Sequence, residues 1–286
     1  MNKLSLIGAA VLMVIPASLR AEDGCGKTPA GNIGVSLWQS GAALGFTTHG
    51  LRVDADGAPN SYRVDGKGLS FTCDGVFGLR NGVPVTQNTD PSGWQKVCQD
   101  AWAKAQQTND YSGVKIVGFA KDANGRPLIQ KDGDPLPNEA YVTTTSLTIP
   151  GTPPDTQRHY PNASEVPYVV LPSQMASQFK MALGDVLLVY RPKTGAMAFA
   201  ISGDCCTAGE GSVKLHQDLK SNPIVVQDGV QRAKAGIADD MVTVMFPEHH
   251  PQPSTDSAEW NRNIQSVGQK AFSDWGGEDR LKACAG

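Results

Sequence analysis

The chain has no concentration of charge of either sign. Its 25 Lys and Arg residues and 28 Asp and Glu residues are interspersed, and they give a formal net charge of −3 at pH 7. Proteins that bind nucleic acid contact its phosphates through clustered basic residues, and no basic run occurs here. The composition therefore argues against nucleic acid as the partner.

Long hydrophobic segments are also scarce. The one apolar run of note covers residues 4–16, with Lys3 before it and small residues up to Ala21 after it. This order is typical of a secretory signal peptide, here residues 1–21, and the apolar core is short for a membrane span. We therefore predict a secreted protein, extracellular or periplasmic, that does not act at a membrane.

Recognisable metal-binding patterns are absent. The sequence has no Cys-x-x-Cys pair, and its one adjacent histidine pair is His249-His250. The Asp-rich stretch at residues 54–57 lacks the later ligands of an EF-hand loop. We therefore predict neither a metal nor another cofactor.

Six cysteines form an even number in a chain that we expect to be exported, which favours disulfides. Six cysteines allow fifteen connectivities, and the sequence does not choose among them. We expect Cys25 or Cys284 to tie down a terminus, and one of Cys205 and Cys206 to brace the loop between them and Glu210. A direct bond between Cys205 and Cys206 would close a strained ring and is the less favoured pairing.

Apolar segments are short, and 31 Gly and 19 Pro residues separate them. This pattern predicts a β-rich fold (all-β or α+β), namely a small β-barrel with peripheral helices that is double-psi-like by analogy. We expect a monomer with one main domain at residues 22–247. Residues 248–286 are predicted to be a Pro-rich linker and a C-terminal helix packed on that domain.

Hydrophobic periodicity places the individual elements. The clearest strands are residues 187–190 and 197–201, joined by a turn. Further strands are predicted at residues 35–38, 69–73, 76–79, 114–119, 128–130, 141–147, 166–171, 224–226 and 241–246. Helices are predicted at residues 92–107 and 213–220 and from residue 257 onwards. In the first helix Trp94 and Trp102 share a face, which favours core packing over the alternative of a sugar-binding platform.

Two carboxylates follow the second of the clearest strands, Asp204 and Glu210, with glycines beside both. Two acids on backbone that turns sharply suit cleavage of a glycosidic bond. One acid protonates the leaving oxygen, and the other activates water or attacks the sugar. An ordinary solvated turn is the alternative interpretation of acids beside glycines.

The segment Gly-Asp204 to Gly-Glu210-Gly-Ser resembles the corresponding block of the glycoside hydrolase family 75 chitosanases. Three further segments resemble blocks of that family and occur in the same order along the chain, at residues 53–60, 141–147 and 166–172. The resemblance implies that Asp204 and Glu210 are the catalytic pair of an inverting endo-hydrolase of chitosan. The family has a longer segment between its acids, with Gly-Pro after the Asp, whereas two cysteines follow Asp204 here.

The resemblance further implies roles for individual carboxylates. Glu210 would be the general acid and Asp204 the base, and the reverse assignment stays open. Asp54 and Asp56 are the predicted substrate-binding residues, because carboxylates lining a cleft attract the protonated amines of chitosan. A plain turn is the alternative interpretation of residues 54–57.

The short cysteine-containing loop leaves two other functions open, since loops set how a glycan fits while the acid pair sets the chemistry. One is hydrolysis of another cell-wall glycan such as peptidoglycan, which would release reducing sugar from purified wall but not from chitosan. The other is a non-catalytic carbohydrate-binding or inhibitor protein on the same scaffold, which would bind glycan without turnover.

Overall fold

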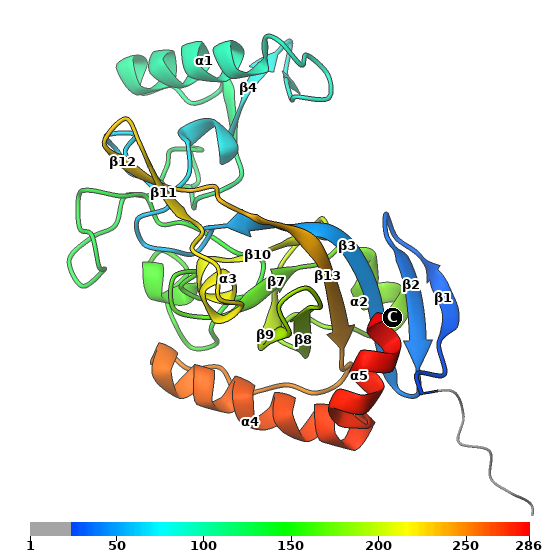
Figure 1. Ribbon diagram of the computed structural model, residues 1–286. Coiled ribbons are helices and arrows are strands. Elements are labelled where there is room, and N and C mark those ends of the chain that lie inside the picture. The colour runs from blue at the N-terminus through cyan, green and yellow to red at the C-terminus, as the bar shows by residue number, and fades with distance from the viewer. Residues whose placement is uncertain (1–23) are drawn as a thin grey trace, which may run out of the picture.

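A computed structural model describes residues 24–286, so the predicted signal peptide lies outside the described residues. Strand accounts for 30% of the chain and helix for 23%, which confirms the predicted β-rich class. The centre of the molecule is a closed six-stranded β-barrel with a few helices around it (Figure 1).

Six strands form the barrel. In spatial order they are β3 (Ala43–Asp54), β10 (Glu210–Ser212), β7 (Tyr168–Val170), β9 (Ala196–Asp204), β8 (Val186–Arg191) and β13 (Ile237–Met245), and β13 pairs with β3 to close the ring. The β3–β10 and β7–β9 pairs are parallel, and the other pairs are antiparallel. The predicted small barrel is thereby confirmed, and its double-psi character remains an analogy.

Other strands lie outside the closed ring. β1 (Thr28–Asn32) and β2 (Ser36–Ser40) add a hairpin to β3, and β11 (Ile224–Gln227) pairs with β12 (Val230–Ala233). A three-stranded sheet of β4 (Val76–Arg80), β5 (Val83–Pro84) and β6 (Val114–Ile116) lies against α1 (Trp94–Thr108). Figure 1 shows α1 and β4 at the top of the molecule, with the β11–β12 hairpin reaching up from the barrel.

The remaining helices are short except for one. They are η1 (Thr72–Asp74), η2 (Gln157–His159), α2 (Gln174–Phe179), α3 (Val213–Asp218), α4 (Ser257–Trp275) and α5 (Gly277–Ala285). No helix within residues 24–286 is long and apolar enough to cross a membrane.

Neighbouring residues of the barrel strands belong to two different apolar clusters. Leu188 packs with Trp260 and Ile264 of α4, whereas the adjacent Val189 belongs to the other cluster. A helix does not fit inside a six-stranded barrel, so the cluster with α4 covers the outer face. The other cluster takes the opposite side of the strands at Val189 and extends to Met175 of α2 and Leu215 of α3. The C-terminal helix thus packs on the barrel, while the domain boundary at residue 247 stays a prediction.

Three predicted strands are not formed. Residues 69–73 lead into the 3₁₀ helix η1, and residues 128–130 and 141–147 make isolated bridges only. The cause at Thr143 is a buried side chain, because the Gln157 amide accepts from the Thr143 N–H at 2.9 Å and donates to its carbonyl at 3.1 Å. A side chain thus takes the place of a partner strand, which periodicity along the chain does not reveal.

All six cysteines are paired, as Cys25–Cys284, Cys73–Cys98 and Cys205–Cys206. The first pair ties the N-terminal segment to the C-terminal helix, as expected. The expectation for Cys205 and Cys206 was wrong, because they bond to each other and not to another segment. The other four cysteines are paired elsewhere and leave the exposed Cys205-Cys206 loop no other partner.

Candidate functional site

The predicted catalytic acids lie in one row across four adjacent strands. Arg52 of β3 is paired with Glu210 of β10, Glu210 with Val170 of β7, and Val170 with Asp204 at the end of β9. Paired residues in a sheet project from the same face, and neighbouring strands are about 4.8 Å apart. A β-bulge shifts the β7–β9 register between Val169 and Val170, just before the pair of Val170 with Asp204. The row holds the Cα atoms of Glu210 and Asp204 about 10 Å apart, and the charge of Asp204 acts on Glu210, so the two carboxyl groups lie near each other.

The predicted substrate-binding acids lie beside this row. Asp54 follows Arg52 by two residues on β3, so it projects from the same face, and it is paired with Ser212 of β10. Its Oδ1 accepts the backbone N–H of Asp56 at 2.8 Å. Asp54 experiences the negative charges of both Asp204 and Glu210, so the structure brings all four predicted site residues into one acidic cluster.

The hydrogen bonds that position the Asp204 carboxylate all go to one of its two oxygens. Its Oδ1 accepts hydrogen bonds from the Ser146 N–H at 2.9 Å, the Ser146 hydroxyl at 2.6 Å and the Cys205 N–H at 2.7 Å. Burial raises the pKa of the Asp204 carboxyl, and these donors offset only part of that rise. The three bonds occupy Oδ1, so Oδ2 is the oxygen that can accept a proton from a ligand or water.

Glu210 is half-buried and paired with a cation. Its side chain is 25% exposed and forms an ion pair with the Arg52 guanidinium, which is itself 68% exposed. Burial raises the pKa of Glu210, Arg52 lowers it and the charge of Asp204 raises it. The net effect is a raised pKa, which suits a carboxyl group that must carry a proton at mildly acidic pH.

The pKa values of Asp54 and Asp56 are both strongly raised. Burial, followed by the charge of Asp204, raises the pKa of Asp54 from 3.8 to about 8. Burial and the charge of Asp54 also raise the pKa of Asp56 well above its ordinary value. Several carboxyls that share a site without enough cations cannot all ionise together.

This shift predicts how stability depends on pH. A raised pKa in the folded chain contributes stability that is fully present below about pH 4 and is lost as the pH rises to about 8. We expect the urea midpoint of the wild type to fall over this range more steeply than that of Asp54→Asn. The exposed Asp132→Asn serves as the control, and equal slopes for wild type and Asp54→Asn would contradict the prediction.

Sequence analysis missed the residues that support the acids. The buried Tyr168 donates its hydroxyl to the Asp56 carbonyl at 2.7 Å, and the Tyr62 hydroxyl bonds to the Asp56 carboxyl. Burial and the nearby carboxylates raise the pKa of both tyrosines and keep them protonated as donors. Ser146 and Tyr168 lie inside the blocks at 141–147 and 166–172, so those blocks carried a signal that could have found them.

An apolar pocket adjoins Asp204. It has a volume of about 210 Å³, and its walls come chiefly from the chain around α2, including Leu171, Met175 and Met181. Asp204 and Ser146 lie in its polar part. A ligand bound at Asp204 can therefore place an apolar group in this pocket.

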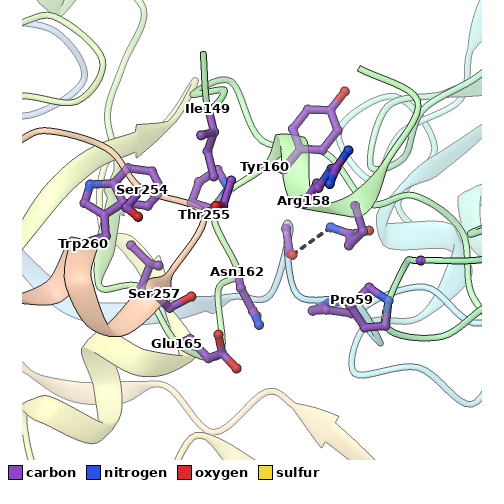
Figure 2. A pocket seen from close by; sticks show the side chains of 16 residues that line it. Pro59, Ile149, Arg158, Tyr160, Asn162, Glu165, Ser254, Thr255, Ser257 and Trp260 are labelled. Carbon is purple, nitrogen blue, oxygen red and sulfur yellow. Dashed lines mark hydrogen bonds between the residues drawn. The ribbon is translucent and has the colours of Figure 1, made fainter. Parts of the chain in front are cut away.

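Another pocket is separate from the acidic cluster. It has a volume of about 180 Å³ and lies between the loop around Tyr160 and the start of α4 at Trp260. Figure 2 shows Glu165 beside Asn162 at its lower edge, and Glu165 is the one carboxylate among the residues described there. Because none of the four predicted acids lines it, we do not place the candidate active site in this pocket.

Comparison with protein-family models and with curated proteins gives no match for this chain. In the part of the chain that the structure describes, no group of three or more His, Cys, Asp or Glu side chains is arranged to hold a metal ion. The functional assignment therefore depends on the geometry of the acidic cluster, together with the resemblance of the four blocks.

Proposed function

We propose that this protein is an exported glycoside hydrolase that cleaves chitosan, a β-1,4-linked amino-sugar polymer, at internal bonds. The observation that carries the proposal is the row that holds Glu210 and Asp204 on either side of Val170, close enough for the charge of Asp204 to act on Glu210. The block resemblance supports the substrate class. The three disulfides support export, because disulfides persist in oxidising compartments.

Glu210 is the general acid of the proposed reaction. It donates its proton to the glycosidic oxygen as the bond from that oxygen to the anomeric carbon breaks. Partial burial raises the pKa of Glu210 and so favours its protonated form before the reaction, and the Arg52 guanidinium stabilises the carboxylate that forms when the proton leaves.

Asp204 is the general base. Its Oδ2 accepts a proton from a water molecule, whose oxygen attacks the anomeric carbon from the face opposite the leaving group. The three donors on Oδ1 favour the charged form of Asp204, which is the form that a general base needs. Inverting enzymes hold their carboxyl groups about 6.5–9.5 Å apart, which leaves room for this water, and Cα atoms about 10 Å apart allow the two side chains to reach that separation.

Asp54 and Asp56 are the proposed contacts for the protonated amine of a glucosamine residue. A cationic amine placed beside them lowers their raised pKa values and favours their ionised forms. Binding of the substrate thus adds positive charge to that of Arg52.

The direct test is incubation of the oxidised mature protein with soluble chitosan at mildly acidic pH. We expect new reducing ends, and NMR of the first products should show the inverted anomer. Products that keep the starting configuration would contradict the inverting mechanism. Binding to insoluble glycan with no new reducing ends from any glycan would contradict hydrolysis and favour the non-catalytic alternative.

The apolar pocket beside Asp204 favours a second candidate, hydrolysis of an N-acetylated wall glycan such as peptidoglycan. Burial of an acetyl methyl group among Leu171, Met175 and Met181 is favourable. Burial of a charged amine in the same place is unfavourable. Release of reducing sugar from purified cell wall but not from chitosan would favour this candidate.

The hydroxyl of Ser146 gives a test of the base assignment. Ser146→Ala removes one donor from Asp204 Oδ1, so the pKa of Asp204 should rise. Since a base must be ionised, the acidic limb of the pH–rate profile should move to higher pH, with activity at pH 5 reduced several-fold. The exposed Thr148→Ala is the matched control, and an unmoved acidic limb in Ser146→Ala would argue for the reverse assignment.

A further inference from the structure

The largest cavity described lies away from the barrel. It has a volume of about 490 Å³ and is formed between α1, η1 and the end of β11. Figure 1 shows α1 at the top of the molecule and β11 below it. This volume is within the range of about 300–1,000 Å³ that is usual for small-ligand sites. Six side chains give the pocket its chemistry: Phe71, Asp74, Trp94, Gln95, Gln99 and Gln227.

The lining combines aromatic rings with amides and one carboxylate. Phe71 is 41% exposed, and the Arg232 guanidinium lies over its ring at 4.3 Å. Gln95 and Gln99 are exposed and one helical turn apart on α1. A sugar ring offers an apolar C–H face to an aromatic side chain and hydroxyls to amides, so this combination suits a carbohydrate.

The walls of the pocket are held together before any ligand binds. The Cys73–Cys98 disulfide joins η1 to α1, and both cysteines belong to the apolar cluster that contains Trp102. A preformed site loses less conformational entropy on binding than one that must be assembled. The pocket is therefore suited to hold a flexible polymer.

The pocket adjoins the acidic cluster through Asp74. The carboxylate of Asp74 acts electrostatically on both Tyr62 and Asp56. Gly75, the next residue, lies so close to the Tyr62 ring that an added Cβ would stand 2.7 Å from it. Asp74 thus lies near enough to the acidic cluster for its charge to act on Asp56, with the buried Tyr62 packed beside it.

We propose that this pocket is a distal subsite for the glucosamine polymer, in which a sugar ring packs on Trp94 or Phe71 and its ammonium group pairs with Asp74. This inference rests on the proposed function. Gln95 and Gln99 donate to and accept from the sugar hydroxyls. The pocket thereby favours chains long enough to reach from the catalytic acids to α1.

The test compares long and short substrates. The double variant Gln95→Ala/Gln99→Ala removes exposed amides from a helix, and Ala preserves helix propensity. We expect kcat/KM for the glucosamine hexamer to fall about ten-fold through KM, with the trimer changed less than about two-fold. The control is Gln107→Ala, an exposed amide of α1 that does not line the pocket.

Two outcomes would overturn the subsite while leaving the proposed reaction intact. They are an unchanged kcat/KM for the hexamer, and an equal decrease for hexamer and trimer. If the wild type cleaves no oligomer, the proposed reaction fails and calorimetric binding of the hexamer decides the subsite. Tighter binding to the wild type than to the double variant would then support it, and equal or undetectable binding would overturn it.

Discussion

Replacing Glu210 by Gln is expected to reduce chitosan hydrolysis by about 10²–10⁴-fold, the usual contribution of a general acid. Gln keeps the size of the side chain but has no acidic proton for the leaving oxygen. It also removes the charge that pairs with Arg52. Initial rates of reducing-end formation at mildly acidic pH measure the effect.

The matched control for Glu210→Gln is Glu165→Gln, a carboxylate exposed in the separate pocket near α4. Its rate should equal that of the wild type. Asp204→Asn should show a loss comparable to Glu210→Gln, because water then lacks its base. Wild-type rates in both Glu210→Gln and Asp204→Asn would eliminate the proposed mechanism.

Replacing Trp260 by Ala is expected to lower the free energy of unfolding by about 3–5 kcal/mol, the usual cost of truncating a large aromatic residue in a core. Trp260 is 2% exposed and packs from α4 into the cluster on the outer face of the barrel. Urea unfolding followed by far-UV circular dichroism measures the change without relying on tryptophan fluorescence.

Gln265→Ala on the exposed side of the same helix is the control for Trp260→Ala, and it should change stability by less than about 0.5 kcal/mol. A single unfolding transition is expected, since α4 and the barrel share one core. If Trp260→Ala instead unfolded α4 alone, at a lower urea concentration than the barrel, the C-terminal segment would be an independent unit.

Periodicity and turn residues located part of the regular elements, although the barrel strands β3 and β10 were not among the predicted strands. The strands at residues 187–190 and 197–201 and the helices from residues 92 and 257 are present as β8, β9, α1 and α4. These elements were predictable because each one exposes an apolar stripe whose spacing depends only on local backbone geometry. The β-rich class followed from them.

Elements stabilised by a distant side chain were not predictable in this way. Residues 141–147 have the composition of a strand, but their backbone at Thr143 bonds to the Gln157 amide. The mutual bond of Cys205 and Cys206 depends on which other cysteines the fold brings together. Both outcomes are set by residues far along the chain.

The same distinction applies to the candidate site. The sequence by itself was enough to choose the candidate carboxylates Asp54, Asp56, Asp204 and Glu210, because glycines lie beside them. Only the tertiary structure decided that they form one cluster, because closure of the barrel sets the register that places Glu210 and Asp204 in one row. Their partners depend on this register and on burial, which are properties of the assembled sheet and not of any single segment.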